Sequence, residues 1–227
     1  MRKINGEFWL CIGSQDLYGD AVLENVKKNG EAMVAELNAS GKLDYKIVLK
    51  PVLITSSLIK KTFEDANRDE NCLGVITWMH TFSPSKSWIP GLKLLTKPLL
   101  HFHTQFRKEI PYDTIDMDYM NENQSAHGDR EYAFALSRLR MPRGIVIGHY
   151  QDERVQGEIN SWMKAAAGIV ESSRLRILRI ADNMRNVAVT EGDKVEAAYK
   201  LGWEVDTYPV NDIVKYVDAV SEAEVNA

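Results

Sequence analysis

Residues 72–89 read CLGVITWMHTFSPSKSWI, and the first eight of them decide the fold. In residues 72–79 both alternating sets of side chains are apolar, which is typical of a parallel strand covered by helices on both faces. The run then stops at His80, which is followed by hydroxyl side chains and a proline. A histidine at a strand end often only forms a hydrogen bond with a loop carbonyl. The position of His80 nevertheless indicates that the strand tip borders a polar pocket.

Strand-like and helical segments alternate along the rest of the chain. This order predicts an α/β fold, a doubly wound parallel sheet of the Rossmann or flavodoxin type. After Arg174 the order strand, loop, helix, strand, helix predicts the beginning of a second α/β unit. We therefore expect two domains, residues 1–172 and a partial βαβα unit at residues 173–227. Ser56 is expected to cap the second helix, and Gly202 to end a helix of the second unit. The expected strands are residues 7–13, 45–54, 72–79, 97–105, 144–150 and 174–182, and the expected helices are residues 21–40, 57–69, 122–140 and 151–171.

The composition favours small-molecule chemistry. The chain has 227 residues, 44% of them apolar, and a net charge of −4. Because Lys and Arg form no basic block, neither nucleic acid nor a membrane is expected as a partner. The N-terminal apolar run is too short for a secretion signal, and no run reaches the about 18 apolar residues that cross a bilayer, so we expect a cytoplasmic protein. Cys11 and Cys72 lie in strand-like runs and are expected to be buried free thiols.

Polar side chains follow the expected strands. In an open parallel sheet the carboxyl ends of the strands meet at one edge, where ligands bind. Four of the five histidines, all except His127, lie at such strand ends. Their clustering predicts a polar pocket at this edge. The strand-end side chains are Gln15, Tyr18, His80, Thr81, Ser83, His101, His103, Gln105, His149, Gln151, Asp152, Asp182 and Asn183.

His101 and His103 are two residues apart in an expected strand, so their side chains share one face. Such a pair can bind a metal ion if a third protein ligand is present. Without a third ligand, the alternative is that the two histidines have a hydrogen-bonding or packing role. The acidic residues within 113–131 can also be explained as side chains at a helix N-terminus, where negative charge interacts favourably with the helix dipole. No glycine-rich phosphate loop, zinc-type cysteine pair or nucleophile elbow occurs, so a nicotinamide enzyme or a nucleotide binder is not expected.

Six long blocks of the sequence stand out together: IGSQDLYG (12–19), VLKP (48–51), HTFSPSKSWIPGL (80–92), KPLLHFHTQF (97–106), DMDYMNENQSAHGDRE (116–131) and DNMRNVAVTEGDKV (182–195). These blocks resemble the N-terminal part of bacterial L-arabinose isomerase, in order along essentially the whole chain. The resemblance implies a cytosolic aldose–ketose isomerase of arabinose catabolism that interconverts L-arabinose and L-ribulose, and often D-galactose and D-tagatose. It also implies a divalent metal, manganese, as cofactor and a homo-oligomer, a trimer or hexamer.

The resemblance also implies roles for particular residues. The family's metal ligands, two glutamates and two histidines, lie in later domains, past Ala227, so none of them is present. The residues that it implies for holding sugar hydroxyls and closing the pocket are present. These substrate-binding residues are Gln15, Leu17, Tyr18 and Met184, together with Gln124 and His127, which in family trimers reach into the neighbouring subunit's site.

Two explanations fit the short chain, a fragment of the enzyme or an independently folding relative. Two functions follow from them. One is an L-arabinose isomerase of shortened form with a replacement catalytic site, and the other is a non-catalytic sugar-binding or assembly module derived from that enzyme. Association into a homo-oligomer is expected in either case. The candidate groups for a replacement site are His101, His103 and His127, with Asp116, Asp118 or Glu122 as carboxylates.

Overall fold

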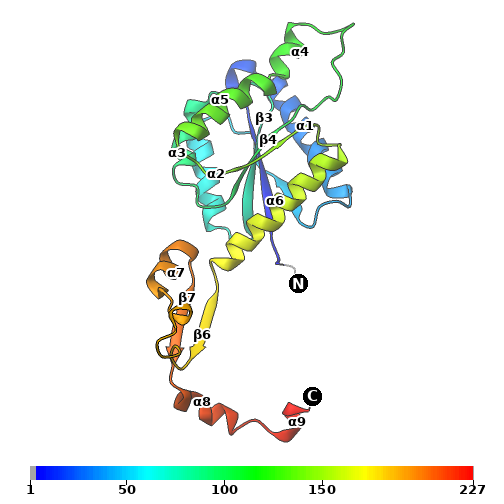
Figure 1. Ribbon diagram of the computed structural model, residues 1–227. Coiled ribbons are helices and arrows are strands. Elements are labelled where there is room, and N and C mark those ends of the chain that lie inside the picture. Colours follow the sequence, from blue (N-terminus) through cyan, green and yellow to red (C-terminus); the bar gives the residue numbers. More distant parts are fainter. Residues whose placement is uncertain (1–3, 227) are drawn as a thin grey trace. The chain divides into compact units, whose positions relative to one another are not determined.

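The computed structural model describes residues 4–226. The fold consists of two compact units, one that runs to Gly168 and one from Ile169 onward. Figure 1 shows the first unit as a parallel sheet surrounded by helices and the second as a small sheet with short helices. The domain boundary expected between residues 172 and 173 stays a prediction.

The first unit is built on a five-stranded sheet in the order β2-β1-β3-β4-β5. All neighbouring strands are parallel. This is the flavodoxin order, in which the direction of winding reverses between β1 and β3, and it confirms the predicted doubly wound α/β fold. The strands are β1 (Glu7–Gly13), β2 (Lys46–Leu49), β3 (Cys72–Met79), β4 (Leu99–His103) and β5 (Gly144–Ile147).

Helices cover both faces of this sheet (Figure 1). On β1, Trp9 and Cys11 join a core made with apolar residues of α2, α3 and α5, while Phe8 on the opposite face lies 5.2 Å from the Trp162 ring of α6. Cys11 and Cys72 are buried free thiols, as predicted. The covering helices are α2 (Ser56–Arg68), α3 (Ile89–Leu92) and α5 (Ser125–Arg138) on one face, and α1 (Asp20–Ala39) and α6 (Glu153–Ser172) on the other.

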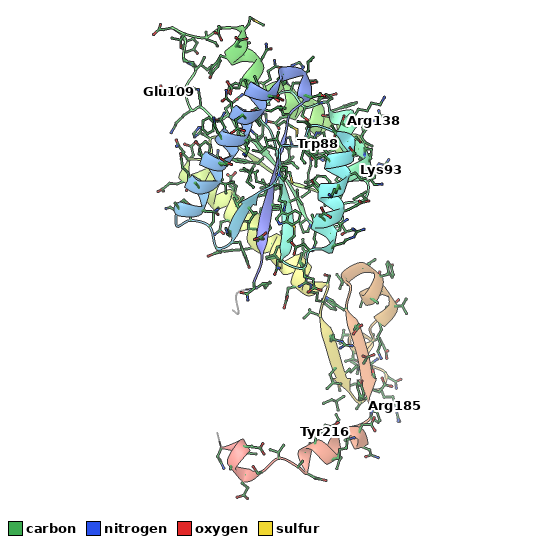
Figure 2. All side chains as sticks on the ribbon, turned by 180° about the vertical axis from the view of Figure 1, so that it is seen from behind. Trp88, Lys93, Glu109, Arg138, Arg185 and Tyr216 are labelled. Atoms are coloured by element: carbon green, nitrogen blue, oxygen red, sulfur yellow. The ribbon has the colours of Figure 1, made fainter. Side chains whose placement is uncertain are left out.

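Strand β3 lies at the centre of the core, and all eight of its residues are buried. The hydroxyl side chains of Thr81 and Ser83 after it are buried too and form hydrogen bonds within the protein. Thr81 Oγ1 donates to Ser14 Oγ at 2.8 Å, and Trp88 Nε1 donates to Ser83 Oγ at 2.9 Å. Figure 2 shows Trp88 in the interior of the unit. These bonds close the sheet edge between β1 and β3 with protein side chains.

Two predicted helix ends differ from the structure. Thr55 rather than Ser56 caps α2, because the Thr55 hydroxyl accepts a backbone N–H of the first helical turn at 3.2 Å. The helix expected over 122–140 is α5, which begins only at Ser125, because a separate short helix, α4 (Met117–Glu122), precedes it. They are separated at Asn123, whose backbone angles (φ −114°, ψ 56°) are not helical.

The second unit has the predicted order of elements. Its two strands, β6 and β7, pair in parallel as a separate sheet. Gly202 ends α7 in the left-handed conformation (φ 76°), as predicted. Within residues 4–226 no helix is both long and apolar enough to cross a membrane. The elements are β6 (Arg176–Ile180), the 3-10 turn η3 (Ala188–Thr190), α7 (Lys194–Leu201), β7 (Glu204–Tyr208), α8 (Val210–Val217) and α9 (Glu222–Val225).

The close packing at the end of β1 gives a test of this core. A Cβ atom on Gly13 would lie 2.7 Å from Met79 Sδ and 2.8 Å from Trp88 Cζ2, so we expect Gly13→Ala to lower the free energy of unfolding by about 1–3 kcal/mol. Gly157→Ala is the matched control, because it lies inside α6 with no atom near the added methyl. It should raise the free energy of unfolding by about 0.5–1 kcal/mol. Urea unfolding measures both, and equal effects would contradict the packing described for β1.

Candidate functional site

The carboxyl ends of all five strands lie at one edge of the first unit because the sheet is parallel. Strand β1 leads there into the 3-10 turn η1 (Asp16–Tyr18), and β4 and β5 lead into loops. Topology therefore brings the strand-end side chains of this unit to one edge. These side chains differ in burial, because some lie in the core and others line a hollow on the surface.

His80 lies in the core rather than beside a pocket. Its side chain is fully buried, its ring stacks on that of Trp78 with centroids 4.4 Å apart, and its Nε2 lies 2.8 Å from Asn29 Nδ2. Burial lowers the pKa of His80 from 6.5 to about 4, which keeps the imidazole neutral. The prediction that this strand tip borders a polar pocket is therefore wrong, because helix α1 covers it with Asn29.

His101 and His103 share one face of β4, as predicted, and both meet a single carboxylate. His101 Nε2 lies 2.6 Å from Asp129 Oδ1, and His103 Nε2 lies 3.3 Å from Asp129 Oδ2. Asp129 and His101 are buried, whereas the His103 side chain is 30% exposed. Because an ionised carboxylate can only accept, the Nε2 of His101 carries the shared proton. We call these three residues the Asp129 cluster.

Asp129 reaches the histidines from the first turns of α5. Residues Ser125, Gly128, Asp129 and Tyr132 form the buried side of that helix, at spacings of three and four. Gly128 allows the close approach, because a Cβ there would lie 3.0 Å from the carbonyl oxygen of Thr81. Burial raises the pKa of Asp129, and the bond to His101 and the charges of both histidines oppose this rise. The helical spacing is the sequence signal that places Asp129 on the buried face.

Of the six residues considered for a replacement catalytic site, His101 and His103 lie together on β4, and the catalytic role of all six stays a prediction. The carboxylate that lies beside the histidines of β4 is that of Asp129. It is none of the three carboxylates proposed from the sequence. The Asp116 carboxylate instead caps α4, accepting the N–H of Tyr119 at 2.8 Å. Among residues 4–226 no three His, Cys, Asp or Glu side chains are grouped as metal ligands, and His101 Nε2 is occupied by Asp129. The described residues therefore do not fit a metal ion. The six candidates are His101, His103, His127, Asp116, Asp118 and Glu122.

The residues implied for sugar binding lie at the surface. Gln124 and His127 line one open hollow of about 730 Å³ at the start of α5, together with Arg130 and Glu131. In η1 Leu17 is exposed and Tyr18 half-buried, and Gln15 precedes this turn. Met184 belongs to the second unit and is 66% exposed. The substrate-binding role of these six residues stays a prediction.

Doubly wound α/β units are a fold class that binds ligands at the carboxyl edge of the sheet, and this unit has polar hollows at that edge. Residues 2–174 match the family model described as the L-arabinose isomerase N-terminal domain, and residues 176–227 match the one described as the L-arabinose isomerase central domain. The chain belongs to the L-arabinose isomerase family.

Curated relatives agree over the whole chain. The L-arabinose isomerase of Clostridium beijerinckii is 54% identical over 227 residues, which is 100% of this chain and 46% of that protein. The L-arabinose isomerase 2 of Clostridium acetobutylicum is 52% identical over 220 residues, 97% of this chain and 45% of the relative. The Thermotoga maritima L-arabinose isomerase is 54% identical over 219 residues, 96% of this chain and 44% of the relative. The chain thus spans a little under half the length of these relatives.

The buried His80 predicts a specific dependence of stability on pH. The unfolded chain binds a proton at His80 below about pH 6.5, and the folded chain does so only near pH 4. The free energy of unfolding should therefore fall as the pH drops through this window, by about 2 kcal/mol between pH 7 and pH 5 from this group alone. His80→Gln should make the pH dependence shallower by that amount, whereas His127→Gln, at an exposed position, should not. Urea unfolding at both pH values decides, and equal slopes for all three proteins would refute the assignment.

The Asp129 cluster predicts unequal effects for two identical substitutions. Asp129→Asn replaces the buried carboxylate that His101 bonds, so we expect a loss of about 1.5–3 kcal/mol in the free energy of unfolding. Asp116→Asn changes an exposed helix cap to another good capping residue and should cost less than about 0.5 kcal/mol. Thermal and urea unfolding at neutral pH measure both, and a stable Asp129→Asn protein would show that the cluster does not hold α5 on the sheet.

Proposed function

We propose that this chain acts in the isomerisation of L-arabinose to L-ribulose as the part of the enzyme that encloses the sugar. The observation that supports this most is the hollow at the start of α5, where Gln124 and His127 lie side by side on exposed surface. A glutamine amide both donates and accepts hydrogen bonds, as sugar hydroxyls do, and an imidazole can do the same through its two nitrogens. D-galactose, with D-tagatose as its product, is proposed as a second substrate of the same reaction.

The Asp129 cluster has a positioning role in this proposal. Ser125 Oγ donates to the carbonyl oxygen of His80 at 3.2 Å, and one turn later Asp129 bonds His101, so two buried bonds fix the first turn of α5. Gln124 immediately precedes this turn and His127 lies within it. The two side chains are therefore presented to a sugar from a fixed backbone, which lowers the entropy lost on binding.

Cofactor, assembly and location follow from the family and are proposed with the activity. A divalent metal, manganese, would supply the polarisation of the substrate oxygens, and because the described residues do not fit it we assign no step of this chain to it. We propose a homo-oligomer, a trimer or hexamer, in which Gln124 and His127 serve a neighbouring subunit. We also propose that the protein works in the cytoplasm.

A hybrid enzyme tests the proposal. Residues 1–227 would replace the matching segment of the Clostridium beijerinckii relative, to which they are 54% identical along their whole length. We expect the hybrid to form ketose from L-arabinose with manganese, and Gln124→Ala or His127→Ala in it to lower kcat/KM about fivefold to tenfold by loss of a hydrogen bond. Arg138→Gln, on the far end of α5, is the control and should leave kcat/KM unchanged.

The unmodified chain separates the two functions. Incubated alone with L-arabinose and manganese, it should form no ketose and still bind the sugar, as a module would. Ketose that disappears on addition of a chelator would favour the shortened isomerase with its own site. A hybrid that folds and forms no ketose would contradict the proposal.

A further inference from the structure

A second hollow lies at the ends of β4 and β5, and three side chains of the predicted strand-end pocket, those of His103, Gln105 and His149, line it. It has a volume of about 500 Å³, within the range of small-molecule sites, and we call it the β4–β5 hollow. Its charged and imidazole side chains are those of Arg107, Lys108, His103 and His149, and no carboxylate lines it. In a chain with a net charge of −4, a hollow lined by basic groups alone is a local exception.

The Arg107 guanidinium is the cation in this hollow that an anionic ligand can reach. Among residues 4–226 no carboxylate forms a salt bridge with it, and its guanidinium carbon lies over the Tyr119 ring, 5.9 Å from the centroid. Lys108 is compensated, because its Nζ lies 3.3 Å from Asp152 Oδ1 on exposed surface. Glu109, labelled in Figure 2 beside the loop, is exposed and does not line the hollow. The net positive charge facing the hollow thus comes from Arg107.

The two imidazoles of the hollow differ in what they can offer a ligand. His149 is occupied by the protein, because its Nε2 donates to the carbonyl oxygen of Phe106 at 3.2 Å and its Nδ1 accepts the N–H of Gln151 at 3.3 Å. His103 directs Nε2 toward the Asp129 carboxylate, which leaves Nδ1 for a contact in the hollow. With the Nε2–H directed at Asp129, Nδ1 is the acceptor nitrogen of the ring, so it suits a hydroxyl group of a ligand.

The remaining wall suits a small organic molecule better than a bare ion. Ile110, Ile115 and Ile147 supply apolar surface, and the amides of Gln105 and Asn123 supply donors and acceptors. A carbon skeleton with hydroxyl groups can use both kinds of surface, whereas an inorganic ion would use only the cation.

We infer that the β4–β5 hollow binds a small hydroxylated organic anion, with its phosphate or carboxylate group on the Arg107 guanidinium. Phosphate and carboxylate each present a pair of oxygens that the planar guanidinium can hold with two parallel hydrogen bonds. The inference does not rest on the proposed function, because Gln124 and His127 do not line this hollow. The two hollows share Met120, Asn123 and Ala126 as a common wall.

The test is a binding titration followed by backbone amide NMR spectra of the whole chain. The probes are inorganic phosphate, a pentose 5-phosphate, a pentonate and the uncharged pentose. We expect the pentose 5-phosphate or the pentonate to shift the amide signals of residues 104–108 and 147–149, and the stronger of the two identifies the anionic group. Inorganic phosphate should bind more weakly, and the uncharged pentose should leave these signals in place.

Two variants separate the hollow from general attraction of anions. Arg107→Gln should weaken binding of the organic anion about tenfold or more, the effect of losing a hydrogen bond to a charged group. Arg138→Gln removes the same charge far from the hollow. In Figure 2 Arg138 lies on the opposite side of the unit from Glu109, which is two residues from Arg107 in the sequence. This variant should leave the affinity within about twofold of that of the unmodified chain. Equal weakening by both variants, no shift at residues 104–108 with any anion, or equal binding of the uncharged pentose would overturn the inference.

Discussion

The buried carboxylate of Asp129 joins the sheet to the helix that carries the candidate site. A carboxylate away from water must be paired, and His101 Nε2 at 2.6 Å from Oδ1 is the hydrogen-bond partner of Asp129, while Oδ2 forms no hydrogen bond within residues 4–226 and lies 3.3 Å from His103 Nε2. Removing Asp129 or His101 would leave the other buried without its hydrogen bond, so the contact fixes α5 against β4 with little tolerance. The backbone permits it only because Gly128 lets the helix approach the carbonyl oxygen of Thr81. The position of the first turn of α5 follows from this contact.

That fixed turn separates two regions of different chemistry. On one side Gln124 and His127 line an open hollow together with Arg130 and Glu131, and on the other the β4–β5 hollow presents Arg107 and His103. The edge between β1 and β3, where flavodoxin-type folds usually bind ligands, is instead filled by two buried hydrogen bonds, from Thr81 to Ser14 and from the Trp88 indole to Ser83. The polar residues of this sheet edge therefore serve the region around α5 rather than the point where the winding reverses.

Much of the fold could be predicted from the sequence because local patterns determine it. The double-faced apolar run of residues 72–79 requires helices on both sides, and the spacing of His101 and His103 places both rings on one face. The missed features depend on contacts between distant segments. Burial of His80 requires Asn29 of α1 to lie over it, and the pairing of His101 with Asp129 requires α5 to approach β4 closely. No spacing of residues in the sequence indicates either contact. Asp116, one of the carboxylates proposed from the sequence, caps a helix instead.

The most direct test of this arrangement is to measure which ring nitrogens of the two histidines of β4 carry a proton. Long-range nitrogen–proton correlation spectra of the histidine rings at neutral pH report which ring nitrogen carries a proton. The account predicts that the Nε2 of His101 is protonated and that this proton exchanges slowly with water, because Asp129 accepts it in the core. A His101 ring protonated only at Nδ1, or a rapidly exchanging Nε2 proton, would contradict it.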